Sequence, residues 1–253
     1  NLDVILVAID HNGLPFTSCP GDEDAAESNI QDSLKYLNNV LFGLKSKTDA
    51  QIILQNIASP AEMMFGSFER QLPGTLSSFV SGINRGLDLL KDPRVVILDA
   101  AGLSANIGLS NWHDPTLWNM AKISFSQRYM PIYADYVCRI LAAQLGKSRR
   151  CLVLDLDNTL WGGVIGDDGL EGILIGNAGA TAEAHLHIQQ TALMLRERGV
   201  VLAVCSKNED AIARMPFKDH PDMLLREEDI AVFQANWSDK ASNIMAISEA
   251  LSL

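Results

Sequence analysis

The stretch from residue 151 to residue 161 places two carboxylates at a spacing that suits phosphate or metal chemistry. Asp155 and Asp157 follow the apolar residues 151–154, a pattern typical of a buried parallel strand. Side chains alternate along an extended chain, so these two carboxylates point the same way. Ligands of open α/β sheets bind at the carboxyl ends of the strands. The pattern therefore predicts an acidic site that shares one Mg²⁺ ion, with phosphate oxygens filling other coordination positions.

These carboxylates also predict a reaction. Beside the charge of a metal ion, Asp155 could attack phosphorus and form an aspartyl-phosphate, with Asp157 as the acid and base. The alternative is structural, namely a strand followed by a turn in which Asp157 and Asn158 hydrogen-bond to the backbone.

A second apolar run, residues 200–204, predicts another buried strand. Ser206 at its end offers a hydroxyl to a phosphoryl oxygen, and Asn208 can cap a helix that begins near Glu209. The backbone N–H groups at the start of that helix favour a nearby anion. Ordinary capping is the alternative interpretation of Ser206 and Asn208.

A helix with apolar positions between residues 244 and 251 is predicted to begin after Ser238, a residue type suited to the N-cap. Lys240 falls in its first turn and could neutralise Asp155 and an incoming phosphate as a point charge. A solvated surface lysine is the alternative.

Glycines punctuate the segment that follows Trp161, at positions 162, 163, 166 and 169. This spacing predicts a twisted hairpin flap over the strand end, with Trp161 as an apolar wall and Asp167 and Asp168 at its tip. A connecting hairpin without a role in binding is the alternative.

These segments resemble a known group of enzymes. The run Asp155-Leu-Asp157-Asn-Thr159 resembles the first motif of the haloacid dehalogenase (HAD) superfamily, and residues 155–169 are similar to its FkbH-like branch. Residues 201–208 resemble the second motif, and residues 235–244 resemble the third, which bears the lysine. The resemblance implies an α/β fold of HAD type, with a Rossmann-like parallel sheet, a hairpin flap and a smaller α/β domain before it.

The resemblance also implies a function. FkbH-like proteins are implicated in transferring a glyceryl unit from 1,3-bisphosphoglycerate to an acyl carrier protein in polyketide-type biosynthesis, with loss of phosphate. The implied cofactor is Mg²⁺ on Asp155 and Asp157, and the implied catalytic residues include Lys240. Residues assigned to the substrate or its phosphate are Thr159, Trp161, Gly162, Ser206, Lys207 and Asn208. Two alternatives stay open, a Mg-dependent phosphatase of a small phosphorylated metabolite and a non-catalytic module that binds a carrier.

Four cysteines, at positions 19, 138, 151 and 205, show no paired or metal-binding spacing, which favours a reducing cytoplasm. Cys205 precedes Ser206 and is the candidate catalytic thiol for a glyceryl thioester. A buried structural cysteine is the alternative, because alternation turns its side chain away from that of Ser206.

The chain has material for two domains. Residues 1–110 predict alternating elements, with strands at 4–9, 51–55 and 95–98 and helices at 25–44 and at 61–90, the latter broken at Pro73. This part resembles SGNH hydrolases only in part, and His113 is interpreted as structural. Residues 111–149 predict a helical connector, including a helix over 129–145. Residues 150–253 form the HAD-like domain, for which the resemblance implies a fourth, acidic motif beyond Leu253 and hence a truncated sequence.

The composition limits the classes of binding partner that can be expected. Lys and Arg number 20 against 31 Asp and Glu, a net charge of −11 without a basic stripe, so nucleic acid is not expected. No apolar run approaches the ~20 residues that cross a bilayer, so no membrane span is expected. An acidic carrier protein would need a basic patch, for which the candidates are Lys147, Arg149, Arg150, Arg196 and Arg198.

Overall fold

The computed structural model describes residues 3–177 and 179–253, and it divides into two compact units, 1–147 and 148–253. Each unit contains a parallel three-stranded sheet with helices on both faces. The predicted α/β class with a Rossmann-like parallel sheet is confirmed. Within the described ranges, no helix combines the length and apolar character needed to cross a membrane.

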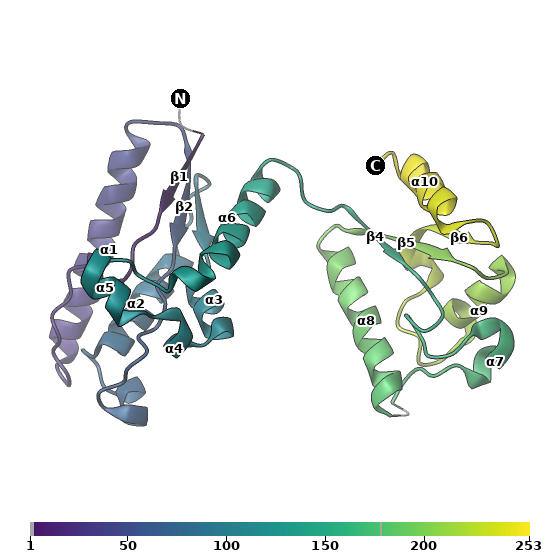
Figure 1. Cartoon of the computed structure of the whole chain (residues 1–253), viewed down its shortest axis with the longest axis horizontal. Helices are drawn as coiled ribbons and strands as arrows, with labels where there is room; N and C mark the ends of the chain where they lie inside the picture. Colours follow the sequence, from purple (N-terminus) through teal and green to yellow (C-terminus); the bar gives the residue numbers. More distant parts are fainter. Residues whose placement is uncertain (1–2, 178) are drawn as a thin grey trace. The chain divides into compact units, whose positions relative to one another are not determined.

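The first sheet has the order β1-β2-β3 and is parallel throughout. Figure 1 shows helices α1 and α6 on opposite sides of it. Its strands are β1 (Val4–Val7), β2 (Gln51–Gln55) and β3 (Val95–Leu98). Its helices are α1 (Glu23–Lys45), α2 (Leu76–Asp88), α3 (Ala100–Ile107), α4 (Leu109–Trp112), α5 (Pro115–Ala121) and α6 (Met130–Gln144), with the 3₁₀ turns η1 (His11–Gly13), η2 (Gly66–Gln71) and η3 (Gln127–Tyr129).

One predicted helix of this unit is wrong. Residues 61–90 were expected to be helical around a break at Pro73, but only α2 is an α-helix there, and it begins after Thr75, whose hydroxyl accepts the N–H of Ser78. Gly74 adopts φ +75°, and a Cβ on it would lie 2.0 Å from the backbone oxygen of Cys19. The chain therefore crosses here as a tight loop rather than as a helix.

The helices after β3 pack onto the first sheet. Trp112 stacks on Phe125 with ring centroids 4.3 Å apart, and Tyr133 of α6 donates its hydroxyl to Oε1 of Gln55 at 2.6 Å. These side chains share a buried cluster with Leu98 of β3. The segment predicted as a connector thus lies within the first compact unit up to residue 147.

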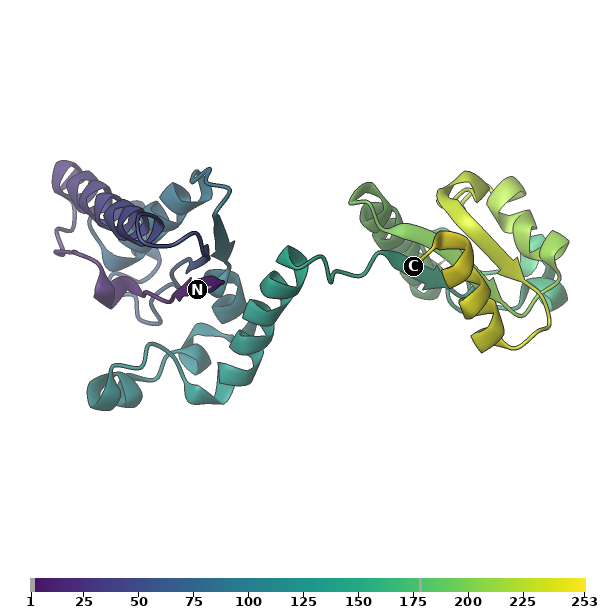
Figure 2. The same cartoon turned by 90° about the horizontal axis from the view of Figure 1, so that it is seen from above.

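The second sheet has the order β4-β5-β6 and is also parallel. Helices α8 and α9 cover one face and α10 covers the other, as Figures 1 and 2 show for α8 and α10. The strands are β4 (Cys151–Leu154), β5 (Val201–Ser206) and β6 (Ile230–Ala235). The helices are α7 (Ile165–Gly172), α8 (Ala180–Glu197), α9 (Asp210–Asp219) and α10 (Lys240–Leu251), with the 3₁₀ turn η4 (Glu227–Asp229).

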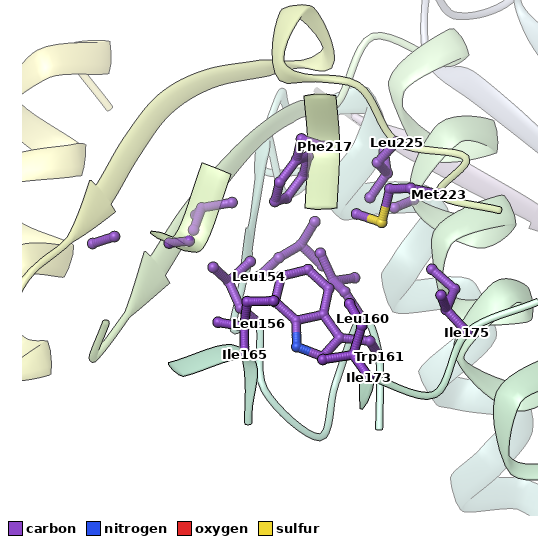
Figure 3. Packing of buried hydrophobic residues seen from close by; sticks show 14 of the residues in the cluster. Leu154, Leu156, Leu160, Trp161, Ile165, Ile173, Ile175, Phe217, Met223 and Leu225 are labelled. Carbon is purple, nitrogen blue, oxygen red and sulfur yellow. The ribbon is translucent and has the colours of Figure 1, made fainter. Parts of the chain in front are cut away.

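The core of the second unit is centred on Trp161. Its side chain is fully buried among Leu156, Ile165 and Phe217, and its ring meets that of Phe217 edge to face at 6.1 Å (Figure 3). Truncating a buried tryptophan to alanine typically costs about 3–5 kcal/mol. Trp161 therefore packs inside the core of the second unit, and the expectation that it forms an apolar wall of the flap is wrong.

The predicted hairpin flap is also wrong. Gly162 and Leu174 exchange backbone hydrogen bonds of 2.9 and 2.8 Å, but the chain between them forms α7 instead of two strands. A carboxylate oxygen of Asp168 accepts the N–H of Val164 at 2.7 Å, so it satisfies a donor at the start of the helix instead of standing at a hairpin tip.

Candidate functional site

The carboxylate of Asp155 and the amine of Lys240 form an ion pair at the carboxyl end of the second sheet. Asp155 directly follows β4, and Lys240 is the first residue of α10. The Lys240 Nζ to Asp155 Oδ2 distance is 2.6 Å, and both side chains are about two-fifths exposed, at 43% and 41%. The two residues are 85 positions apart in sequence, so the fold brings them together as the sequence predicted.

Asp157 is fixed by donors from three different segments. Its Oδ1 accepts the indole N–H of Trp161 at 3.0 Å and the backbone N–H of Ile165 at 3.1 Å, and its Oδ2 accepts from Asn208 Nδ2 at 2.8 Å. Two donors fill the capacity of Oδ1, whereas Oδ2 keeps acceptor capacity. The carboxylate is therefore held in one orientation, with Oδ2 available for further contacts.

Asn208 connects the two strand ends. Its Nδ2 contacts both Asp157 Oδ2 and Ser206 Oγ, the latter at 3.2 Å. Both Ser206 and Asn208 are almost fully buried. The capping role considered for Asn208 is not found, because α9 has Glu209 at its N-cap and no side-chain cap there. Its amide serves the acidic site instead.

The turn after β4 contains two residues with positive φ, Asn158 and Gly163. Asn158 adopts a left-handed conformation with φ +56°, and its Oδ1 accepts the N–H of Gly163 at 3.1 Å. Gly163 has φ +93°, and a Cβ on it would approach Asp168 Oδ2 to 2.5 Å. Asparagine and glycine are the residues that tolerate such backbone angles. Asn158 thus shapes the turn, while Asp157 beside it provides a carboxylate of the site.

Helix α8 supports this turn from behind, which sequence reasoning missed. Gln189, which is fully buried, donates to the carbonyl of Leu160 at 2.8 Å and accepts from Leu224 and Leu225. A ring nitrogen of His185 lies 2.8 Å from the carbonyl oxygen of Thr159. One sequence signal was present, a glutamine at an interior position of an otherwise apolar helix face, which indicates a buried partner.

The remaining predicted residues lie around the acidic pair with differing exposure. Lys207 is exposed directly after β5, and Thr159 is half-buried in the turn. Gly162 is buried, and a Cβ on it would meet Leu174 Cβ at 3.1 Å and His185 Nε2 at 3.2 Å. Gly162 therefore allows close packing within the segment after β4, and the structure gives it no open path to a ligand.

The Cys205 thiol faces away from Ser206. Cys205 is 3% exposed and packs in a cluster with Ala203 and Ile247 beneath α10. Burial raises the pKa of this thiol, to which the charge of Asp155 adds, while Lys240 acts in the opposite direction. A thiol that stays protonated is a poor nucleophile. The geometry therefore favours the structural interpretation of Cys205.

The donor chemistry of the site fits Mg²⁺. Free acceptor capacity remains on both oxygens of Asp155 and on Oδ2 of Asp157. Over residues 3–177 and 179–253, no group of three or more His, Cys, Asp or Glu side chains could hold a metal ion by itself. Mg²⁺ commonly binds through one or two carboxylates together with water and substrate phosphate. Asp155 and Asp157 therefore suit a cation that a phosphate substrate helps to hold.

Comparison with known proteins gives one structural relative. No protein-family model and no curated protein sequence matches this chain. A solved structure that does match is the crystal structure of the N-terminal part of the protein BF1531 from Bacteroides fragilis, which contains a phosphatase domain and is complexed with Mg. The two chains share 30% sequence identity with a TM-score of 0.86, covering 99% of this chain and 66% of that chain. This chain thus spans slightly less than two thirds of its relative.

Proposed function

We propose that this protein is a Mg²⁺-dependent phosphatase of HAD type in which Asp155 is the nucleophile. The observation that carries the proposal is the Asp155–Lys240 pair at the strand ends, with Asp157 anchored beside it. The structural similarity to a chain with a phosphatase domain, complexed with Mg, supports the same chemistry.

In the proposed reaction, an oxygen of Asp155 attacks the phosphorus atom, and the bond from phosphorus to the leaving oxygen breaks. Asp157 gives a proton to the leaving oxygen and then takes one from the water that attacks the aspartyl-phosphate. That second attack releases phosphate and restores the Asp155 carboxylate. Mg²⁺ supplies charge neutralisation for the phosphoryl oxygens when it is bound.

Other residues of the site have roles in holding the phosphate. Lys240 provides a positive charge beside Asp155, which offsets the repulsion between the carboxylate and a phosphate dianion. The hydroxyls of Ser206 and Thr159 and the exposed amine of Lys207 are donors for phosphoryl oxygens. Asn208 acts beside them, because its amide donates to Ser206 Oγ and Asp157 Oδ2 and holds both in place. The free thiols of the chain support a cytoplasmic location for this activity.

The test is phosphate release from a panel of small phosphate esters and acyl phosphates by the whole chain, with and without Mg²⁺. We expect Mg²⁺-dependent release that Asp155→Asn abolishes, and a phosphorylated peptide containing Asp155 in rapidly quenched samples. Asp92→Asn is the control, since that carboxylate pairs with Lys45 in the first unit. Release that persists in Asp155→Asn would contradict the assignment of the nucleophile.

The finer form of the proposal is glyceryl transfer. Residues 155–169 resemble the FkbH-like branch, which supports a reaction in which 1,3-bisphosphoglycerate loses phosphate and its glyceryl unit passes to an acyl carrier protein. The exposed residues Lys147, Arg149 and Arg150 offer positive charge to an acidic carrier, whereas Arg196 already pairs with Asp229 at 3.0 Å.

Intact-protein mass spectrometry distinguishes transfer from plain hydrolysis. The chain is mixed with Mg²⁺, 1,3-bisphosphoglycerate and a candidate carrier protein, and Asp155→Asn serves as the control. A glyceryl adduct on the carrier that is absent in the control supports transfer. Phosphate release with unmodified carriers leaves the phosphatase proposal and removes the transferase.

A further inference from the structure

Two asparagine side chains next to the site exchange hydrogen bonds with each other. Asn236 Nδ2 donates to Asn243 Oδ1 at 3.1 Å, and Asn243 Nδ2 donates to Asn236 Oδ1 at 2.9 Å. Asn243 is only 4% exposed. The Asn236 oxygen also accepts the backbone N–H of Ser238 at 2.9 Å. The two amides therefore hold each other, and loss of Asn236 would leave the buried Asn243 side chain without this partner.

This amide pair joins the segments that carry the proposed catalytic groups. The backbone N–H of Asn236 donates to the carbonyl of Ser206 at 3.2 Å, which ties the loop after β6 to the end of β5. Asn243 lies on α10 three positions after Lys240, and residues at that spacing are neighbours on a helix surface. The first turn of α10 is thereby fastened to the strand ends from which the phosphate site is built.

We propose that the Asn236–Asn243 pair is a positioning device that sets Lys240 against Asp155. The inference deepens the proposed phosphatase function, although its geometric part can be tested without any activity. Lysine has a flexible four-carbon stem, so the location of its amine depends on where the helix start is held. The Asp239 cap, which accepts the N–H of Ser242 at 2.9 Å, orders this helix start locally but does not tie it to the sheet.

The first test measures how Lys240 reacts with an amine-acylating reagent in the whole chain, by mass spectrometry of its peptides. Exposed Lys207 serves as the internal reference. Pairing with Asp155 protects Lys240 in the wild type. We expect Asn243→Ala to raise the Lys240 rate relative to Lys207 by about fivefold, the factor that corresponds to loss of an ion pair worth about 1 kcal/mol. An unchanged ratio would overturn the proposal.

Ile247→Val is the matched control, because Ile247 is buried on the same helix and packs against Ala203 and Cys205, and its apolar side chain takes no part in the amide hydrogen bonds. It should lower the melting temperature while leaving the labelling ratio unchanged. A rise equal to that of Asn243→Ala would mean that any loosening of α10 frees Lys240, and the proposal would fail. If Asn243→Ala does not fold, Asn243→Ser replaces it.

The second test is a kinetic double-mutant cycle on phosphate release. Asn243→Ala should lower kcat/KM about tenfold, chiefly through kcat, because a misplaced group loses stabilisation of the transition state. In a Lys240→Ala background the same change should cost less than about twofold, since the residue it positions is gone. Equal losses in both backgrounds would show a purely structural role. If the wild type releases no phosphate, the proposed function fails and the labelling test still decides the positioning role.

Discussion

Lys240 supplies the positive charge next to the proposed nucleophile. Its amine lies 2.6 Å from Asp155 Oδ2, and it is a single point charge next to the proposed nucleophile. We expect Lys240→Ala to lower kcat/KM for phosphate release by about 10²–10³, the range seen when one preorganised electrostatic group is removed. The kcat/KM of Lys240→Arg should lie between those of the wild type and Lys240→Ala, because arginine keeps the charge but its planar guanidinium differs in shape from an amine. Steady-state phosphate assays give both values, and a variant with wild-type kcat/KM at Lys240→Ala would contradict the role.

Cys205 offers a separate test through its pKa. Burial raises the pKa of this thiol, so the neutral form persists to higher pH than in an unfolded chain, where a thiol has a pKa of about 8.5. The stabilisation linked to this shift is complete below the unfolded pKa and is lost as the pH rises through the folded pKa. We expect slow alkylation of Cys205 at neutral pH, compared with exposed Cys138, and no loss of phosphate release in Cys205→Ala. Peptide mass spectrometry measures the alkylation rate of Cys205. A defect of Cys205→Ala in loading a carrier protein would argue for a thioester on Cys205.

At the scale of elements, Arg214 ties α9 to the segments beside it. Its Nε contacts Asp210 Oδ2 at 2.8 Å, another nitrogen bonds to Glu227 of η4, and its guanidinium lies 4.2 Å from the ring centroid of Phe233 on β6. The contacts with Glu227 and Phe233 tie α9 to η4 and β6, whereas the pair with Asp210 lies within α9 itself. The arrangement predicts a stability effect larger than that of an ordinary surface ion pair.

We expect Arg214→Met to lower the melting temperature by several degrees, as about 1 kcal/mol of stacking is lost. The hydrogen bond from Arg214 lowers the pKa of Glu227, so this stabilisation is present above the unfolded pKa and is lost as the pH falls through the folded one. The difference from wild type should therefore narrow in acid. Arg139→Met is the control: it removes an exposed pair with Asp135 and a longer contact of 5.6 Å with the Tyr136 ring, and it should lower the melting temperature less. Calorimetry at neutral and acidic pH decides, and a difference that widens in acid would contradict this account.

The elements also show what sequence can and cannot predict. Strand β4 was predictable because a short apolar run that ends in two carboxylates is typical of a buried parallel strand. The pairing of Lys240 with Asp155 was predictable from the helix start after Ser238 and the resemblance of residues 235–244 to the lysine-bearing third motif. Helix α7, where a hairpin was expected, was not predictable, since glycines indicate that a chain turns but not which element it forms between turns. Asn236 and Asn243 were also missed, because a reciprocal amide pair depends on tertiary contact and leaves no periodic trace.

At the scale of the whole molecule, the two units have separate cores. Leu154, Trp161 and Phe217 belong to a cluster drawn wholly from the second unit, and Phe79 and Ile83 belong to one drawn wholly from the first. Every predicted site residue, from Asp155 to Lys240, lies within 148–253. The proposed chemistry is thus built from one unit, and the first unit contributes no side chain to the predicted set.

Trypsin provides the test of this separation. Lys147, Arg149 and Arg150 lie in the exposed residues 145–150 between α6 and β4, and exposed segments are cleaved before packed ones. We expect brief proteolysis to cut there first and to leave two resistant fragments. Phosphate release should remain with the fragment that begins near residue 150. Initial cleavage inside α8 or α9 would contradict the separate cores, whereas activity that vanishes on the linker cut alone, with both fragments folded, would mean that the proposed chemistry needs the first unit as well.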